Sequence, residues 1–168
     1  MEDIIYCQRD IPKEQWRYGF RASAATGCGW IAIYNALRLM GYHPNPEKII
    51  ASLEKQLPLL HGNAGTMPLA PAFFFIRRGF RVEYLSRPDL FDDLAGRSDA
   101  CILYYHWRNG WKFGAHFVAL QRTPEGIVGY NTFRNSIGPD NYGNSLIQFI
   151  KKQRFFGAVL IGICDSKK

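Results

Sequence analysis

The spacing of apolar residues along the chain changes from helical to strand-like near position 80. Residues 28 to 40 repeat apolar side chains at helical spacing, and Gly41 follows as a stop signal. Pro46 predicts the start of a second helix through about residue 57, and Thr66 is a candidate cap for a third helix that continues to residue 79. The apolar faces of the first and third helices are expected to contain Ile31, Tyr34, Leu37 and Leu39, and Leu69, Phe73 and Ile76, respectively.

After Gly79 the pattern is typical of β-strands. Segments 81 to 86, 100 to 107, 112 to 122, 126 to 133 and 156 to 163 are rich in aromatic and β-branched residues. Asn109-Gly110 and residues 123 to 126 have turn chemistry, and short helices are expected at 89 to 95 and 144 to 152. Helices followed by an antiparallel sheet predict an α+β fold.

Length and composition fit a single domain. The 168 residues are 47% hydrophobic, enough to bury a core without disulfides or metal, and no repeat or low-complexity linker interrupts them. We expect one domain over residues 1 to 168, with a helical lobe at about 1 to 80 and a β-sheet lobe at about 81 to 168. The four cysteines, at positions 7, 28, 101 and 164, show no CxxC spacing, so we expect them to be reduced and to bind no zinc.

The charge pattern limits the expected partners. The formal charge is +7, but the basic residues are spread along the chain, and only Lys151, Lys152 and Arg154 and the pair Lys167 and Lys168 cluster. This spread favours a solvated basic face over a nucleic-acid interface. No signal peptide and no apolar run of about 18 residues is evident, so we expect a soluble, cytoplasmic protein with no membrane partner.

Cys28 stands at the start of the most apolar helix-like run. If Thr26 is the N-cap, Cys28 lies in the first helical turn, where free amides and the helix dipole favour a thiolate. Gly27 and Gly29 would leave the sulfur uncrowded and let a substrate backbone approach. The alternative interpretation is a small core residue. A catalytic role requires a base within reach of the thiol.

His116 is the candidate base and Asn131 the candidate residue that orients it. Strand alternation places His116 on one face with Gly114, which would leave room beside the imidazole. If the turn at 123 to 126 pairs Arg122 with Ile127, Asn131 becomes a diagonal neighbour of His116 on that face, and the two side chains can hydrogen-bond. A bulge of one residue would turn Asn131 to the other face.

Three short segments resemble the papain-like cysteine peptidases, and the C39-like peptidases in particular. The run from Gly27 to Leu37 (GCGWIAIYNAL) looks like their nucleophile helix, and residues 116 to 120 (HFVAL) and 129 to 132 (GYNT) look like the next two blocks. The resemblance covers roughly residues 15 to 135 and a last strand. It implies a papain-like fold with Cys28 as nucleophile, His116 as general base and Asn131 as the residue that orients the base.

The sequence departs from that family at two places. C39-like sequences usually carry Asp where Asn131 stands, whereas papain-like ones carry Asn. The family's oxyanion glutamine is expected about six residues before the cysteine, where this chain has Ala22. Gln15 is the candidate replacement, with Ser23 and Thr26 as closer, weaker hydrogen-bond donors. Loss of one oxyanion donor lowers a rate by about 100- to 1,000-fold, so this residue separates a fast enzyme from a slow one.

The resemblance implies a cysteine peptidase or amidase that cleaves a peptide bond through a thioester and needs no cofactor or metal. An acyltransferase would use the same thiol, and a catalytically weak or inactive papain-like module would only bind peptides. A nucleic-acid-binding protein is a third class, which would need its cations gathered on one face with exposed aromatics. A peptide or protein is the expected substrate, and the oligomeric state stays open.

The remaining histidines and the aromatic residues are not expected to belong to the site. A turn closed at Asn109-Gly110 would place His106 opposite Phe113, away from His116, and His43 and His61 stand in loop contexts. The aromatic residues could form a substrate wall, but their spacing favours core positions. They are Phe73, Phe74, Phe75, Trp107, Trp111 and Phe113.

Overall fold

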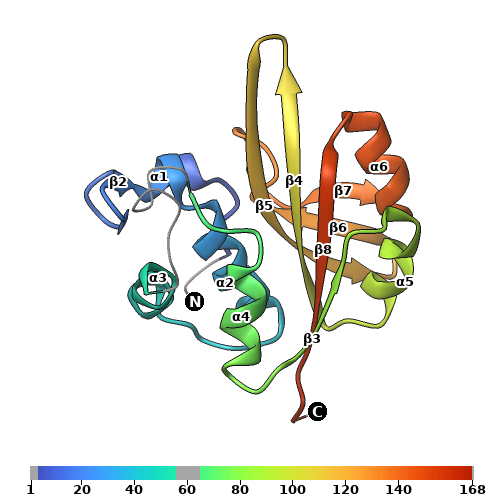
Figure 1. The fold of residues 1–168 in the computed structure, drawn as a ribbon, viewed down its shortest axis with the longest axis horizontal. Coiled ribbons are helices and arrows are strands. Elements are labelled where there is room, and N and C mark those ends of the chain that lie inside the picture. Colours follow the sequence, from blue (N-terminus) through green and yellow to red (C-terminus); the bar gives the residue numbers. More distant parts are fainter. Residues whose placement is uncertain (1–3, 56–64, 168) are drawn as a thin grey trace.

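A computed structural model describes residues 4–55 and 65–167. Its centre is a six-stranded antiparallel sheet with the strand order β3-β8-β4-β5-β6-β7. The helices that precede the sheet in sequence cover one of its faces, and α5 and α6 cover the other (Figure 1). The predicted α+β fold, with helices first and an antiparallel sheet after them, is confirmed.

Most helices come before the long strands in the sequence, and α5 and α6 are inserted between strands. The helical segments are η1 (Gln8–Asp10), α1 (Ser23–Thr26), α2 (Cys28–Leu39), α3 (Pro46–Glu54), α4 (Ala70–Ile76), η3 (Pro88–Leu90), α5 (Phe91–Gly96) and α6 (Leu146–Gln153). The strands are β1 (Arg17–Tyr18), β2 (Arg21–Ala22), β3 (Arg81–Leu85), β4 (Ala100–Asn109), β5 (Lys112–Thr123), β6 (Gly126–Tyr130), β7 (Asp140–Gly143) and β8 (Phe156–Cys164). The sequence pattern does not predict the small β1–β2 pair, η1, α1 or β7.

The register of the central strands decides which residues meet. Arg122 pairs with Ile127, so the predicted β5–β6 register is confirmed. The β4–β5 prediction is wrong by two residues, because Asn109 pairs with Lys112 and the turn consists of Gly110 and Trp111. Gly110 has a φ of 59°, which this tight turn requires. His106 therefore lies opposite Ala115 and not Phe113.

Each face of the sheet has its own core. Phe117 and Ala119 of β5 pack toward α2, α3 and α4, while Val118 and Leu120 pack toward α5 and α6. The two cores follow from strand alternation, which sends successive side chains to opposite faces. Because both faces are covered, the middle of β5 is fully enclosed.

The third helix differs from its prediction. It begins at Ala70 and ends at Ile76, and Thr66 does not cap it. Phe74 and Phe75 are buried, whereas Leu69, Phe73 and Ile76 are exposed; the predicted apolar face is therefore wrong. The second helix ends at Glu54, and residue 57, its predicted end, and His61 lie outside the described residues.

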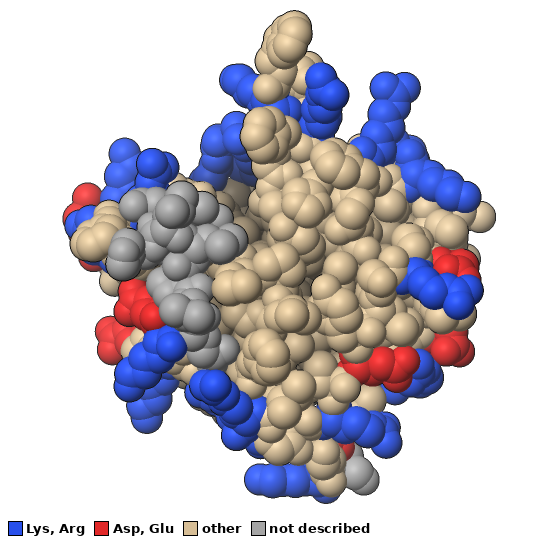
Figure 2. Space-filling view, viewed as in Figure 1, with Lys and Arg blue, Asp and Glu red and all other residues tan. Residues whose placement is uncertain are grey.

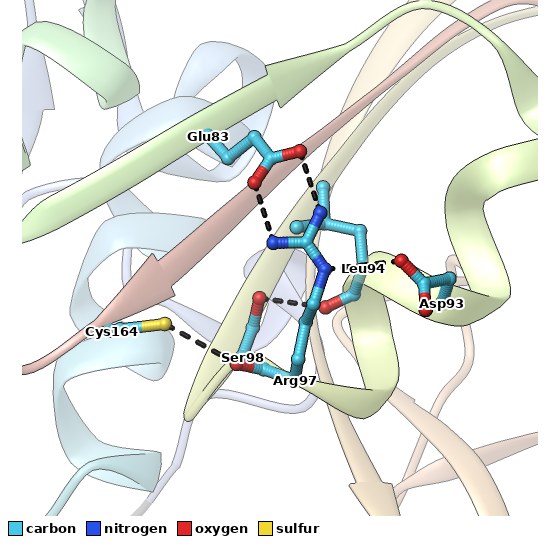
Figure 3. A network of polar contacts seen from close by, with 6 residues as sticks. All are labelled: Glu83, Asp93, Leu94, Arg97, Ser98 and Cys164. Carbon is cyan, nitrogen blue, oxygen red and sulfur yellow. Dashed lines mark hydrogen bonds and ion pairs between the residues drawn. The ribbon is translucent and has the colours of Figure 1, made fainter.

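A polar network ties α5 to the sheet on the side away from α2. The Arg97 guanidinium forms two bonds of 2.6 Å to the Glu83 carboxylate of β3 and one of 3.1 Å to Asp93 (Figure 3). The ion pairs with Arg97 lower the pKa of Glu83. Cys164 donates from its sulfur to the Arg97 carbonyl at 3.4 Å, which links the end of β8 to the same corner.

No helix in the described ranges is long and apolar enough to cross a bilayer. The four cysteines are all free in the structure.

Candidate active site

Cys28 is the first residue of α2 and is partly buried against the core. The residue before the helix is Gly27, which makes no side-chain cap, so the expected Thr26 cap is wrong. Thr26 ends the short helix α1, and the Gly27 amide donates to the Ser23 carbonyl at 2.8 Å. The chain thus enters α2 through a preceding helical turn.

The glycines beside Cys28 are required by packing. A Cβ at Gly27 would lie 2.5 Å from the Ser23 carbonyl oxygen and 2.7 Å from Nε1 of the buried Trp30. A Cβ at Gly29 would overlap the side chain of Thr66. Both glycines are therefore required by tight packing, and the expectation that they leave the sulfur open to substrate stays a prediction.

Burial keeps the Cys28 thiol protonated. It raises the pKa of Cys28 from its ordinary 9.0 to about 11, against backbone hydrogen bonds from Phe117, Gly29 and Cys28 that lower it. The helix-start position favours a thiolate as expected, but desolvation of the charged form outweighs it. The prediction of a thiol with a lowered pKa is wrong for the resting site.

The Phe117 contact locates the sulfur on the sheet. Phe117 lies in β5 directly after His116, and its backbone hydrogen-bonds the Cys28 thiol. Antiparallel pairing of β6 with β5 begins only at Ala119, so the edge of β5 next to Phe117 is not covered by β6. The thiol therefore lies beside β5 close to the point where its pairing with β6 begins.

His116 points one ring nitrogen at a carbonyl. Its Nε2 lies 2.6 Å from the backbone oxygen of Asn131. A carbonyl oxygen only accepts, so Nε2 carries the proton and Nδ1 is left as an acceptor. Burial lowers the pKa of His116, and the hydrogen bond to Asn131 opposes that shift. The resting imidazole is therefore favoured in its neutral form.

Asn131 contributes its main chain, and not its side chain, to His116. Strand β6 ends at Tyr130, earlier than the predicted residue 133, because Asn131 adopts a φ of 65°. Non-glycine residues seldom adopt this left-handed conformation, although Asn tolerates it best. The turn aims the Asn131 carbonyl at His116 and sends the side chain elsewhere. The predicted bond between the two side chains is corrected accordingly.

The Asn131 side chain binds Gln8, a residue that sequence reasoning missed. The backbone N–H of Gln8 donates to Asn131 Oδ1 at 2.8 Å, and Asn131 Nδ2 donates to the side-chain oxygen Oε1 of Gln8 at 3.4 Å. Gln8 Nε2 also donates to the Ala24 carbonyl of α1 at 3.2 Å. Gln8 therefore joins the segment carrying Asn131 to the helical turn before Cys28. Its place in a polar N-terminal stretch gave no signal of this.

The expected oxyanion donors differ in their positions. Gln15 is exposed, and it lines a cavity of about 400 Å³ between the N-terminal segment and residues Ser136 and Ile137. Ser23 accepts from Trp30 Nε1 at 3.1 Å. The Thr26 hydroxyl is buried, and within the described ranges it has no hydrogen-bond partner. Of the three, Thr26 is the residue close to Cys28 in the chain whose buried hydroxyl has no hydrogen-bond partner of either kind among the described residues, whereas the Ser23 hydroxyl already accepts one bond.

The space predicted beside His116 is filled by aromatic rings. Trp107 covers Gly114, where an added Cβ would lie 2.7 Å from the indole. The Tyr105 ring lies edge-on to the His116 ring at 6.0 Å between centroids and stacks on Phe155 at 3.9 Å. His116 is thus held by its strand neighbours as well as by Asn131.

The three predicted residues are gathered at one end of β6, but they do not form a closed hydrogen-bonded chain. Within residues 4–55 and 65–167, no hydrogen bond joins the Cys28 sulfur to the His116 ring. The same ranges hold no cluster of His, Cys, Asp and Glu suited to a metal ion. The arrangement offers a neutral thiol, a neutral imidazole with a free Nδ1, and a carbonyl that fixes the tautomer.

Comparison with known proteins adds a fold relationship. No protein-family model matches this sequence, and no curated protein matches it. Among solved structures, the chain is similar to the peptidase domain of Streptococcus ComA, a bi-functional ABC transporter involved in a quorum sensing pathway. The match has a TM-score of 0.54 and 14% identity, and it covers 84% of this chain and 93% of that one. At this identity the similarity establishes a shared fold, that of a C39 peptidase domain, and nothing finer.

Proposed function

We propose that this protein is a cysteine peptidase or amidase that cleaves a peptide bond through a thioester on Cys28. The observation that carries the proposal is the 2.6 Å bond between His116 Nε2 and the Asn131 carbonyl. This bond fixes the tautomer in which His116 Nδ1 can accept a proton. His116 is also the neighbour in sequence of Phe117, whose backbone contacts the Cys28 sulfur. The shared fold with a peptidase domain supports the same assignment.

The reaction starts from neutral groups. His116 Nδ1 takes the Cys28 proton as the sulfur attacks the substrate carbonyl, and the resulting imidazolium gives that proton to the leaving amine as the C–N bond breaks. The same nitrogen then deprotonates a water molecule, which attacks the thioester carbonyl; the C–S bond breaks, the imidazolium returns the proton to the sulfur, and the acid is released. The Asn131 carbonyl stabilises the transient imidazolium, because hydrogen bonds from a charged donor are stronger.

Two donors are available for the negative oxygen of the tetrahedral intermediate. One is the Cys28 backbone amide at the start of α2, and the other is the buried Thr26 hydroxyl. This pair would replace the glutamine that is absent at position 22. Thr26→Val removes the hydroxyl at nearly constant size and should lower kcat/KM by about 10- to 1,000-fold while the fold is kept.

The test uses a peptide library made by digesting an unrelated proteome. Wild-type protein should generate new peptide ends, read by mass spectrometry, and Cys28→Ala should generate none. Quenching in acid should preserve an acyl adduct on Cys28, visible by intact mass. His116→Ala should reduce cleavage by at least about 100-fold, as expected for loss of a general base.

A second candidate is a papain-like module that binds peptides without cleaving them. The raised pKa of Cys28 and the lowered pKa of His116 favour it, because both shifts oppose a thiolate–imidazolium pair at rest. Alkylation of Cys28 against pH separates the two. If His116→Ala leaves the alkylation rate unchanged at every pH and no peptide is cut, the binding module replaces the enzyme. If an added amine captures the acyl group in preference to water, the acyltransferase is the better description.

A further inference from the structure

The hairpin formed by β4 and β5 projects beyond the rest of the molecule (Figure 1). Trp111 in its turn is 97% exposed, and Phe113 in β5 is 82% exposed. The expectation that both are core residues is wrong. Aromatic side chains of this size are usually buried for most of their surface, so two of them at one exposed tip indicate a docking surface.

The same tip is positively charged. Arg108 and Lys112 flank the turn and are exposed. Residues 100 to 123, which form the whole hairpin, contain no Asp or Glu. The field at the tip is therefore set by cations alone, and the hairpin complements a negatively charged surface.

A second basic cluster lies at the same end of the sheet. Phe156, the first residue of β8, pairs with His106 near the tip of β4. The chain enters β8 from the last turn of α6, where Lys151, Lys152 and Arg154 are exposed. Residues 141 to 164 also contain no acidic residue. Figure 2 shows Lys and Arg side chains around the projecting end, with Asp and Glu side chains farther down this face.

We propose that this basic aromatic end, defined by Arg108, Trp111, Lys112, Phe113, Lys151 and Lys152, docks on the surface of an anionic lipid bilayer. The tip is convex, whereas sites for peptides and small ligands are concave. A projecting Trp and Phe can enter the interfacial layer of a bilayer, where aromatic rings are favoured. The surrounding cations then face the anionic headgroups, each contributing about a five-fold gain in affinity.

Docking of this kind would place Cys28 near the bilayer. Phe113 precedes Phe117, whose backbone contacts the sulfur, by four residues of one strand. At about 3.3 Å per residue, the two backbones are roughly 13 Å apart. The surface that we infer is separate from the thiol and from the His116–Asn131 bond, so it holds whether or not the site is catalytic.

The test is co-sedimentation of the full chain with vesicles containing about one-third phosphatidylserine in phosphatidylcholine, at low and at physiological salt. We expect binding to these vesicles, at least ten-fold weaker binding to pure phosphatidylcholine, and loss of binding in high salt. Trp111→Ser with Phe113→Ser should reduce binding about ten-fold or more. Lys151→Glu with Lys152→Glu should reduce it similarly. Phe73→Ser on α4 and Lys48→Glu on α3 are matched controls and should bind as wild type does.

Tryptophan fluorescence tests whether Trp111 inserts into the bilayer. Vesicles should shift the tryptophan emission to shorter wavelength, and Trp111→Phe should abolish the shift while binding is kept. The proposal is overturned if vesicles bind without any Trp111-dependent shift, or if RNA or heparin competes and binds more tightly than the vesicles do, which would indicate a polyanion site. It is equally overturned if wild type forms a dimer that Trp111→Ser dissolves, or if none of these partners binds.

Discussion

The inner and outer halves of strand β5 share their pairing with β4 and differ in how far the rest of the molecule covers them. Residues 112 to 120 pair with β4 in one unbroken register. Residues 117 to 120 are buried, because α2 covers one face, α5 and α6 cover the other, and β6 closes the edge from Ala119 onward. Residues 112 to 116 have lost that cover and are exposed or half-buried. Continuous pairing with β4 keeps the outer half of β5 ordered. Because no described helix covers it, its side chains are accessible to other molecules.

The candidate site stands at the boundary between the two halves. Phe117 is the last buried residue toward the tip, and its backbone holds the Cys28 sulfur. His116 is the first half-buried one, and it holds the Asn131 carbonyl. A nucleophile needs rigid support on one side and access for substrate on the other, and this boundary supplies both.

The largest expected effect compares two phenylalanines of β5. Phe117→Ala removes a ring that is 2% exposed and contacts Tyr104, so it should lower the free energy of unfolding by about 3–5 kcal/mol. Phe113→Ala, four residues away on the same strand, should change it by less than about 0.5 kcal/mol. Urea denaturation of both variants measures the contrast. Similar losses in the two would mean that the outer half is covered in solution.

The next effect concerns Asn131 at the boundary. Asn131→Ala removes two hydrogen bonds to Gln8. It also places alanine, which tolerates the left-handed conformation less well than Asn, at a φ of 65°. The free energy of unfolding should therefore fall by about 2–4 kcal/mol. Asn131→Gly loses the same bonds but adopts this φ freely, and it should recover about 1 kcal/mol.

Activity should separate the two roles of Asn131. Since His116 is bound by a backbone oxygen, Asn131→Gly should keep cleavage within about ten-fold of wild type at temperatures where it is folded. A loss of 100-fold or more with the fold intact would show that the side chain, and not the carbonyl, serves His116 during turnover. Asn131→Asp, which retains the acceptor for the Gln8 amide, is the matched comparison.

The smallest effect is a dependence of stability on pH. Burial lowers the pKa of His116 below its ordinary 6.5, so the unfolded chain binds a proton more readily than the native one. Stability should therefore fall as the pH drops through and below about 6.5, and it should be regained above that value. Denaturation of wild type and His116→Gln between pH 5 and 8 tests this. The variant should show a flatter profile; parallel profiles would mean that His116 is more solvated than its neighbours indicate.

The sequence predicts most of the fold because its local signals agree with the long-range pairing. The turn at residues 123 to 126 set the β5–β6 register, and strand-like spacing located the long strands. It failed where tertiary contacts override local pattern. Asn109-Gly110 looked like the turn, but the chain uses Gly110 and Trp111. Helix α4 buries Phe74 and Phe75, because the side of a short helix that faces the core is chosen by its neighbours.

The site was predictable to the level of residues but not of atoms. Cys28, His116 and Asn131 all lie around the end of β6, yet a backbone φ of 65° exchanges the side chain of Asn131 for its carbonyl. No pattern of residue types reports such a dihedral angle. The balance between helix dipole and burial at Cys28 was also hidden, because desolvation depends on atoms from β5 that are about 90 positions later in the chain.

The position of β8 has a consequence for how the protein folds. It follows every other described strand in the sequence, yet it lies inside the sheet, between the edge strand β3 and β4. During synthesis the edges of β3 and β4 that pair with β8 therefore stay unpaired until residues 156 to 164 have left the ribosome. Such late, long-range closure slows folding and exposes strand edges to other chains. We expect the sheet that supports Cys28 to stay incomplete in a nascent chain until β8 has been synthesised, so that the site forms only after that strand has paired.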